Sequence, residues 1–199
     1  MHPNPLFRER DHARLEALVR DVGFGMVFLT TPKGPRVAHV PVLSDGAGDI
    51  RFHLAHSNSL TSHLDGARAV ITVNGPDGYV SPRWYDNRDT VPTWDYAAVE
   101  IEGKVRALSD QELERLLHDV IETFEARLDG EPWLASESSE KVWSGLFRGI
   151  TGFSMSVEEW RPTFKLSQKK SAPERERIAA GLDASGKAEL ARWMREAQP

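Results

Sequence analysis

The sequence predicts a mainly β fold with peripheral helices, in which an antiparallel sheet curls into a closed or nearly closed barrel. Two observations support this prediction. Short segments rich in apolar and β-branched residues follow one another at 26–31, 36–43 and 50–55, with turns between them, as in an antiparallel meander. A longer segment at 96–108 alternates apolar and polar side chains, which is typical of a half-buried strand. Consecutive strands with short turns argue against a parallel sheet, whose strands need long crossover connections.

The other elements of the first half follow from periodicity and turn residues. A helix is expected at 11–22, where apolar side chains recur at helical spacing. The meander contains a glycine-rich turn at 45–48. One or two helical turns at 57–64 and a strand at 69–73 come next. The cluster Asn-Gly-Pro-Asp-Gly at 74–78 then predicts a dense turn.

The second half mixes helices and strands. A loop with two prolines, two tryptophans and a tyrosine is expected at 82–95, ahead of the long strand. Ser109 and Glu112 have the spacing of a capping box, so they mark the start of the most regular helix in the sequence. The remaining expected elements are a second helix at 139–147, strands at 151–158 and 164–167, and tail helices at 173–182 and 186–196.

The length of 199 residues suits one domain with a small appendage. We expect residues 1–170 to form the barrel domain, including its inserted helices. Residues 171–199 are expected to form a helical tail that packs on the barrel or on a partner subunit.

Composition excludes several classes of protein. The 25 Lys and Arg residues against 30 Asp and Glu give a net charge of −5, which excludes a chain-wide basic field for nucleic acid. The chain has no cysteine, so disulfides, thiolate nucleophiles, iron–sulfur clusters and cysteine zinc sites are excluded. No apolar run approaches the ~20 residues of a membrane span, and the first residues lack the apolar core of a signal peptide. A cytoplasmic location is therefore expected.

Common catalytic signatures are absent: the sequence contains no GxGxxG, GxxxxGK[ST], GxSxG or HExxH motif. Seven histidines raise the question of a metal. His53 and His56 are three residues apart on an expected strand, so their side chains point to opposite faces and cannot share one ion. We therefore expect no metal site.

The segment at 56–59, His-Ser-Asn-Ser, lies where a strand passes into a short helix. A helix N-terminus offers free N–H groups and a partial positive charge, and Ser and Asn add neutral donors. Phosphate binding is one interpretation. The alternative is that Ser57 or Asn58 only caps the helix.

Aromatic residues concentrate in the loop segments 81–85 and 91–96, beside turn residues. Aromatic rings with a few polar groups suit a planar ligand, although Trp and Tyr also anchor long loops to a barrel. Further along, residues 165–177 contain five Lys or Arg and two Glu. That segment either holds an anion or is a solvated charged run.

The same segments carry a resemblance to a known family. They are the opening at 1–7, AHVPVL at 38–43, HLAHSN at 53–58, YVSPRWY at 79–85, VPTWDY at 91–96, ITGF at 150–153 and KLSQ at 165–168. In this order and spacing they resemble the FMN-binding negative transcriptional regulator family of the PaiB type. VPTW-x-Y and KLSQ are the most specific of them, and the resemblance covers about residues 1–182.

The resemblance implies an antiparallel split β-barrel of the FMN-binding type. In such folds two barrels pair, and FMN lies in a groove between the subunits, so a homodimer with FMN as cofactor is expected. Residues 56–59 would then lie near the phosphate, and Lys165 and Gln168 would close over the cofactor. The full set of residues expected at the cofactor is His39, His56, Ser57, Asn58, Ser59, Ser81, Trp84, Thr93, Trp94, Tyr96, Lys165 and Gln168.

Two positions depart from the family pattern. The family usually has Asn where this chain has Asp95, and Asn-Arg after KLSQ where this chain has Lys169 and Lys170. An aspartate at position 95 removes hydrogen-bond donors, which puts in doubt any pairing of that position with the flavin ring.

The expected function is that of a flavin-dependent sensor or an indirect negative transcriptional regulator. Direct DNA binding is not expected, because the net charge is negative and no helix-turn-helix is evident. One alternative is an FMN-dependent reductase or oxidase acting on a small molecule, with His39, His56 and Tyr85 as its titratable candidates. A second alternative is a haem-binding protein on the same barrel.

Overall fold

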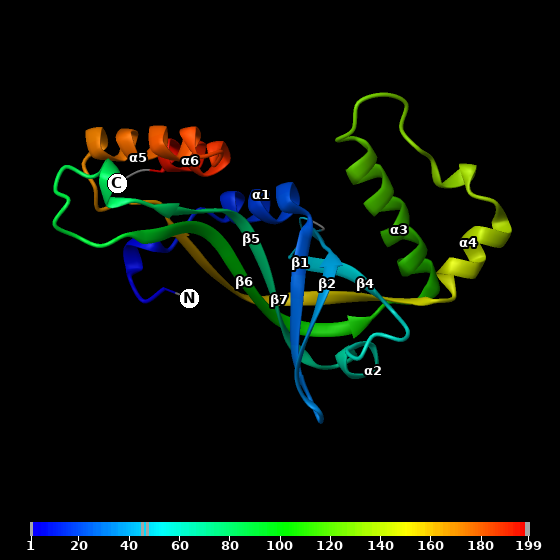
Figure 1. Cartoon of the computed structure of the whole chain (residues 1–199). Helices are drawn as coiled ribbons and strands as arrows, with labels where there is room; N and C mark the ends of the chain where they lie inside the picture. The colour runs from blue at the N-terminus through cyan, green and yellow to red at the C-terminus, as the bar shows by residue number, and fades with distance from the viewer. Residues whose placement is uncertain (1, 45, 47, 198–199) are drawn as a thin grey trace. The chain divides into compact units, whose positions relative to one another are not determined.

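The structure is a computed structural model, and it describes residues 2–44, 46 and 48–197. Within these residues, seven strands form one sheet in the order β2-β1-β5-β6-β7-β4-β3, with helices around it (Figure 1). The pairs β1–β2, β1–β5, β3–β4 and β4–β7 are all antiparallel. The predicted mainly β, antiparallel fold with peripheral helices is confirmed. The turn expected at 45–48 includes residues 45 and 47, which lie outside the described residues.

The strands are β1 (Phe24–Thr31), β2 (Gly34–Pro41), β3 (Leu43–Ser44), β4 (Asp49–Ala55), β5 (Arg68–Val80), β6 (Thr93–Ala107) and β7 (Ile150–Lys165). The helices are α1 (His12–Val22), α2 (Thr61–Leu64), α3 (Asp110–Glu125), α4 (Glu140–Phe147), α5 (Ala172–Ala184) and α6 (Ala188–Glu196). Single 3₁₀ turns are η1 (Pro5–Phe7), η2 (Pro82–Trp84) and η3 (Ala135–Glu137).

The two edges of the sheet belong to one short stretch of chain. β2 ends at Pro41 and β3 begins at Leu43, although these strands stand at opposite ends of the strand order. Only Val42 separates them, and its amide donates to the carbonyl of Gly23 at 3.0 Å. A sheet whose edge strands are joined by one residue must curl back on itself, which produces a barrel.

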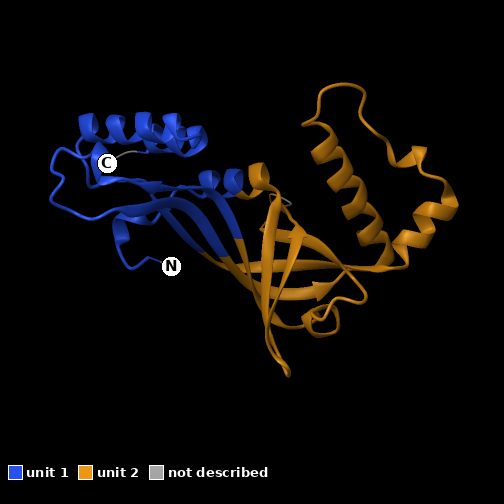
Figure 2. Ribbon diagram, viewed as in Figure 1, with its two compact units in different colours: residues 1–18, 73–100, 161–199 blue, residues 19–72, 101–160 orange. Residues whose placement is uncertain are grey.

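The chain forms two compact units, which Figure 2 colours separately. Unit 1 contains residues 1–18, 73–100 and 161–199, and unit 2 contains residues 19–72 and 101–160. The long strands β5, β6 and β7 contribute residues to both units. Neither unit ends at the expected boundary at residue 170, and the division into a barrel domain and a tail stays a prediction.

The core of unit 2 forms where inward-facing side chains of β4 and β7 meet. Phe52 and Phe153 are direct partners in the register, and their ring centroids are 5.5 Å apart. Both rings are fully buried. β6 and β7 approach closely at Gly103, because a Cβ atom there would collide with the carbonyl oxygen of Ser156. A glycine is therefore required at this point of the barrel wall.

The core of unit 1 joins α1, the outer parts of the long strands and the tail helices. Leu18 of α1 lies against Gly75 of β5, and Leu190 of α6 lies against Gly78. Arg175 is buried in α5 and donates to the carbonyls of Met194 and Ala197 at the end of α6. The guanidinium thus satisfies carbonyls that the helix itself leaves without partners.

Two details of the expected secondary structure are wrong. The cluster 74–78 does not turn, because β5 runs through it from Arg68 to Val80. Its glycines allow close packing instead: a Cβ atom at Gly75 would lie 2.8 Å from Leu18, and one at Gly78 would lie 2.9 Å from Leu190. The strands expected at 151–158 and 164–167 are parts of one strand, β7.

No helix in the described part of the chain is long and apolar enough to cross a membrane.

Candidate functional site

Unit 1 carries an aromatic groove. Its volume is about 280 Å³, and its lining combines three aromatic rings with polar and charged side chains. The groove is lined by Tyr79, Ser81, Arg83, Trp84, Trp94, Ser185 and Lys187. These residues come from the end of β5, η2, the start of β6 and the connection between α5 and α6. Aromatic rings beside two cations suit a planar, anionic ligand.

Trp94 is held in one orientation although its side chain is largely open to solvent. The residue is 52% exposed. Its indole Nε1 donates to Oδ1 of Asp77 at 3.2 Å, and its ring meets the ring of Tyr79 at an angle of 69° with centroids 6.3 Å apart. Lys187 Nζ also lies 3.7 Å from Oδ1 of Asp77. A large exposed ring that is fixed by neighbours is a ready surface for stacking.

Trp84 and Ser81 make contacts within the protein that hold the loop after β5. A Cβ atom at Gly181 would overlap the indole of Trp84, so this ring packs directly on α5. Ser81 is buried, and its Oγ accepts from the amide of Arg83 at 3.3 Å as the N-cap of η2. Both residues still line the groove. They shape it while anchoring the loop that follows β5.

Lys165, at the end of β7, joins the KLSQ segment to the start of β6. Its ammonium group donates to Oγ1 of Thr93 and to the carbonyl of Trp94, the latter at 2.5 Å. It also lies 3.3 Å from Oδ1 of Asp95. Two donors of the ammonium are used in hydrogen bonds, and its charge is paired with Asp95, all within unit 1. Lys165 therefore positions the backbone on which Trp94 stands.

Asp95 is a fully buried carboxylate in the middle of this network. Oγ of Ser167 donates to its Oδ2 at 2.5 Å, while its Oδ1 has the ion pair with Lys165 but no hydrogen bond of good geometry. Burial raises the pKa of Asp95 above its ordinary value, and this effect exceeds the lowering by Ser167 and Lys165. The carboxylate of Asp95 therefore contacts Ser167 and Lys165 inside the protein and does not face a ligand.

Gln168 and Ser167 complete the KLSQ segment by closing its turn. Oε1 of Gln168 accepts from the amide of Leu166 at 2.8 Å, and its Nε2 donates to the carbonyl of Phe164. Ser167 has a φ of 55°, a left-handed conformation that is unusual for a residue other than glycine. This conformation aims the hydroxyl of Ser167 at Asp95. Lys165 and Gln168 thus have structural partners, and their expected contact with the cofactor stays a prediction.

The segment 56–59 lies in unit 2, between β4 and α2, and it forms turns. The helix after it has only four residues, and the amides of Leu60 and Thr61 already donate to Oδ1 and the carbonyl of Asn58. A helix-terminus site of the expected kind therefore has few open N–H groups. Among the described residues, the exposed hydroxyls of Ser57 and Ser59 and the imidazole of His56 have no hydrogen-bond partner, which leaves donors suitable for a phosphate.

The remaining expected site residues are His39 and Tyr96. His39 is exposed on β2, where its ring stacks on Phe24 with centroids 6.4 Å apart. Tyr96 is half-buried on β6 in unit 1. The structure thus brings Ser81, Trp84 and Trp94 together in the groove. It links Thr93 and Lys165 beneath Trp94, and it places His39 and 56–59 in the other unit.

Sequence reasoning missed four residues of the groove: Tyr79, Arg83, Ser185 and Lys187. Only the folding of the tail onto β5 and η2 brings Ser185 and Lys187 there. Tyr85, a titratable candidate for the enzyme alternative, is buried under the ammonium of Lys170, which lies 3.7 Å from its ring centroid. Burial raises the pKa of Tyr85, and the carboxylates of Asp95 and Glu174 raise it further, so the phenol stays protonated at neutral pH. Among the described residues, no group of three His, Asp or Glu side chains could hold a metal ion.

These features fit a flavin by their chemistry. The rings of Trp94 and Tyr79 offer surfaces for the isoalloxazine, and Arg83 and Lys187 supply positive charge beside them. The open donors at His56, Ser57 and Ser59 are of the type that phosphates accept. In contrast, the polar groups of Lys165, Ser167 and Gln168 make hydrogen bonds within the protein.

The barrel and its groove define the class: a split β-barrel of the flavin-binding type. Solved structures support the fold. The chain is similar to the FAD and heme binding protein from Mycobacterium smegmatis, at 16% identity and a TM-score of 0.62 over 88% of this chain and 80% of that one. It is also similar to the flavocytochrome Anf3 from Azotobacter vinelandii, at 16% identity and a TM-score of 0.59 over 83% of this chain and 72% of that one.

Sequence comparison shows the family. Residues 1–159 match the family model described as "Putative FMN-binding domain". The chain is 32% identical to Protease synthase and sporulation protein PAI 2 of Bacillus subtilis over 157 residues, which cover 77% of this chain and 75% of that protein. The chain therefore belongs to the FMN-binding family of the PaiB type, and FMN is the cofactor of this family.

Proposed function

We propose that this protein is an FMN-binding homodimer that acts as a flavin-dependent sensor or an indirect negative transcriptional regulator. The observation that carries the proposal is the fixed, exposed indole of Trp94 in the aromatic groove, within a chain of an FMN-binding family. Covering an exposed tryptophan ring with a ligand costs little side-chain entropy when that ring is already immobilised. The isoalloxazine of FMN is the planar group that this surface would take.

The residues proposed to hold FMN are assigned by chemistry. In unit 1, Trp94 would stack on the ring, with Tyr79 at its edge and Thr93 and Lys165 holding the backbone of Trp94. Separately, in unit 2, His56, Ser57 and Ser59 are proposed as donors to a phosphate, as the family resemblance implies. When bound, FMN supplies a redox-active ring whose state a sensor can report.

A surface on β1 and β2 supports the proposed homodimer. Phe28 and Val37 are register partners, and both side chains are exposed, 40% and 45%. Phe24 lies on the same face four residues earlier in β1, because side chains on one face recur at every second residue, and the pair between them is Met26 with His39. Several exposed apolar side chains on one face of a folded chain are typical of a protein interface. A second copy is the proposed occupant, and Phe28→Glu is expected to turn a dimer into a monomer in sedimentation velocity.

The regulator interpretation is preferred over the enzyme alternative because it is the role that the family resemblance implies. Among the described residues, the titratable side chains that line the groove are Tyr79, Arg83 and Lys187. Tyr85 is buried and its pKa is raised, and the groove's own charged groups are Arg83 and Lys187. An indirect role is preferred because the net charge of −5 opposes a direct complex with DNA. The cytoplasmic location expected from the composition stays a prediction.

The test is an absorbance titration of the purified protein with FMN, followed by removal of excess cofactor. A retained flavin band at about one FMN per chain is expected, and a protein that releases all FMN would contradict the proposal. Reduction of the bound flavin by NADH or NADPH faster than free FMN would favour the enzyme. A Soret band after haem addition, lost in His39→Ala or His56→Ala, would favour the haem-binding alternative.

The phosphate contacts have their own control. Ser57→Ala with Ser59→Ala is expected to weaken FMN binding at least tenfold while leaving riboflavin, which lacks the phosphate, unaffected. Equal losses of affinity for FMN and riboflavin would show that the phosphate of FMN binds elsewhere.

A further inference from the structure

A helical arm interrupts the barrel between β6 and β7. It comprises residues 109–149 and contains α3, η3 and α4, all within unit 2 (Figure 1). The arm contains ten Asp and Glu residues and four Lys and Arg residues, a net charge of −6. Since the whole chain has a net charge of −5, the rest of the molecule is close to neutral. The protein's negative charge is therefore concentrated in this one insertion, where two of the ten carboxylates, those of Glu112 and Asp119, are paired with Arg106 and Arg51 of the barrel.

The inner side of the arm is fixed to the barrel by apolar packing. Leu113 and Leu116 of α3 are buried against Leu43, next to the end of β2. Phe147 of α4 packs against the same cluster, so both helices of the arm share one attachment. The ring of Phe124 fills the space where Gly23 lacks a side chain. Both helices of the arm are thus anchored to the rest of unit 2 by their inner faces.

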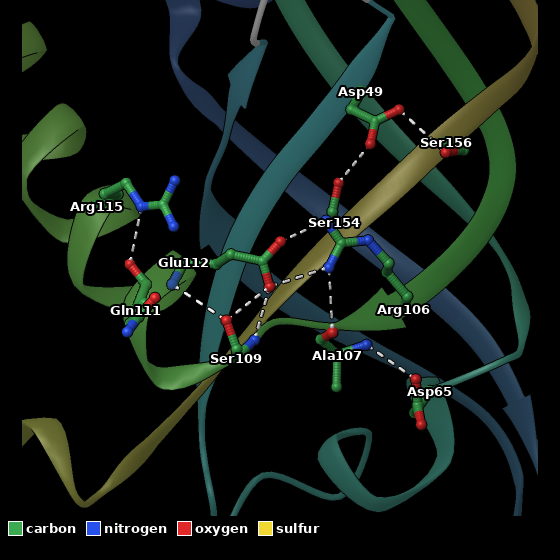
Figure 3. Close-up of polar contacts among 10 residues, drawn as sticks. All are labelled: Asp49, Asp65, Arg106, Ala107, Ser109, Gln111, Glu112, Arg115, Ser154 and Ser156. Carbon is green, nitrogen blue, oxygen red and sulfur yellow. Dashed lines mark hydrogen bonds and ion pairs between the residues drawn. The ribbon is translucent and has the colours of Figure 1, made fainter.

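Polar contacts at both ends of α3 add to this attachment. At its start, Ser109 and Glu112 form the expected capping box, and Arg106 of β6 donates to both carboxylate oxygens of Glu112 at 2.8 and 3.2 Å (Figure 3). At its end, Arg127 donates to the carbonyls of Arg20 and Asp21, at 2.5 and 2.9 Å. These contacts set the direction in which the arm's outer side faces.

The outer side of the arm exposes large apolar side chains. Val142 and Leu146 are four residues apart on α4, so they form one stripe, and they are 52% and 71% exposed. The neighbouring stripe of α4 is used internally: Trp143 donates to Glu114, and Phe147 packs in the cluster. Leu128, Trp133 and Leu134 are also exposed in the connection between the two helices. Rigid, exposed apolar side chains amid excess negative charge indicate a binding surface.

We propose that this outer side of the arm binds a basic amphipathic helix of a partner protein. Apolar side chains of that helix would pack on Val142 and Leu146, and its Lys and Arg residues would face the surrounding carboxylates, such as Glu137 and Glu140. The charge of the arm repels phosphates, which disfavours both nucleic acid and anionic lipid surfaces. A symmetric contact between two copies would place two arms of charge −6 against each other, which disfavours a second copy.

This proposal goes beyond flavin binding and does not depend on it. It provides a protein-mediated route for an indirect regulator. The two can fail separately, because the FMN titration tests one surface and peptide binding tests the other.

The probe is a fluorescein-labelled 18-residue helical peptide of Leu and Lys, with Leu at the i, i+3, i+4, i+7 spacing. The control peptide has Glu in place of Lys. We expect the Leu/Lys peptide to bind the full chain in an anisotropy titration and the Leu/Glu peptide not to bind. The double variant Val142→Ser, Leu146→Ser is expected to weaken binding at least tenfold. The matched control is Leu6→Ser, an equally exposed apolar position (58%) in unit 1.

Charge is tested with Glu137→Lys together with Glu140→Lys, which should weaken binding and reduce its dependence on salt. Equal binding of both peptides, or equal loss in the Leu6→Ser control, would overturn the proposal. A monomer–dimer shift caused by the Val142→Ser, Leu146→Ser variant would also overturn it, because the surface would then belong to a second copy. Circular dichroism and the thermal unfolding midpoint of each variant show whether it is folded.

Discussion

The ammonium of Lys165 lies 3.3 Å from the buried carboxylate of Asp95, so the end of β7 and the start of β6 are tied together by an ion pair that is almost wholly shielded from water. The two side chains are 15% and 1% exposed. The same ammonium donates to Oγ1 of Thr93 and to the backbone carbonyl of Trp94, the residue with the exposed indole. The most specific sequence motifs thus meet beneath the proposed ring-binding surface.

The pH dependence of stability follows from the raised pKa of Asp95. A carboxyl group whose pKa is higher in the folded than in the unfolded state stabilises the fold less as pH rises from the unfolded value through the folded one. Asp95→Asn removes this titration. Its free energy of unfolding is therefore expected to increase relative to that of the wild type as pH rises. Lys165→Met is expected to destabilise by about 3–5 kcal/mol at neutral pH, because it leaves a buried carboxylate without its cation. Urea unfolding across the acid-to-neutral range measures both, and a pH-independent difference between Asp95→Asn and wild type would contradict this account.

Ser167 combines an unfavourable backbone conformation with a favourable hydrogen bond. Ser167→Ala keeps the left-handed φ and removes the donor to Asp95, so it should cost about 1.5–3 kcal/mol. Ser167→Gly loses the same hydrogen bond but relieves about 1 kcal/mol of backbone strain. The alanine variant is therefore expected to be the less stable of the two in thermal unfolding. The reverse order would show that the conformation is not strained.

The indole of Trp84 packs directly on the backbone of α5 at Gly181. A methyl group there would overlap the indole, so Gly181→Ala should destabilise by about 1–3 kcal/mol and release the η2 loop from the helix. The matched change is Gly145→Ala in α4, where nothing lies within 4 Å of the added atom. That variant should gain about 0.5–1 kcal/mol, as alanine favours helices. Denaturant midpoints that moved the same way for both would argue against the Trp84 contact.

The base of the arm depends on the ionised form of Glu112. Hydrogen bonds from Arg106 and then from Ser109 lower the pKa of Glu112 from the usual 4.5 to about 2. The resulting stabilisation is fully present above the usual value and is lost as pH falls towards 2. The protection factors of α3 amides, which compare exchange with the intrinsic rate at the same pH, should therefore fall at acid pH, and Glu112→Gln should remove this dependence (Figure 3). Ser109→Ala should cost about 1 kcal/mol as the loss of an N-cap. Exchange in α3 that is insensitive to both changes would contradict the role of the capping box.

The sequence predicted those parts of the fold that depend on local periodicity. The helical repeat at 11–22, the alternation at 96–108 and the capping box at Ser109 all appear in the structure near the expected bounds. The glycine cluster at 74–78 does not form the predicted turn. Packing of Gly75 and Gly78 against residues distant in sequence outweighs the local turn preference.

The candidate site was less predictable than the fold. The spacing of KLSQ does not reveal that Lys165 and Ser167 reach back about seventy residues to Thr93 and Asp95. Nor does the sequence distinguish Trp94, whose ring is exposed, from Trp84, whose ring packs on Gly181. Both properties arise from tertiary contacts with β5 and the tail helices.

The most direct measurement is a calorimetric titration of FMN into the wild-type chain and into Trp94→Leu. Trp133→Leu, which changes an exposed tryptophan outside the groove, is the matched control. We predict binding of about one FMN per chain in the wild type and the control, and at least a tenfold loss of affinity in Trp94→Leu. Unchanged affinity in Trp94→Leu would contradict the assignment of the aromatic groove as the flavin surface.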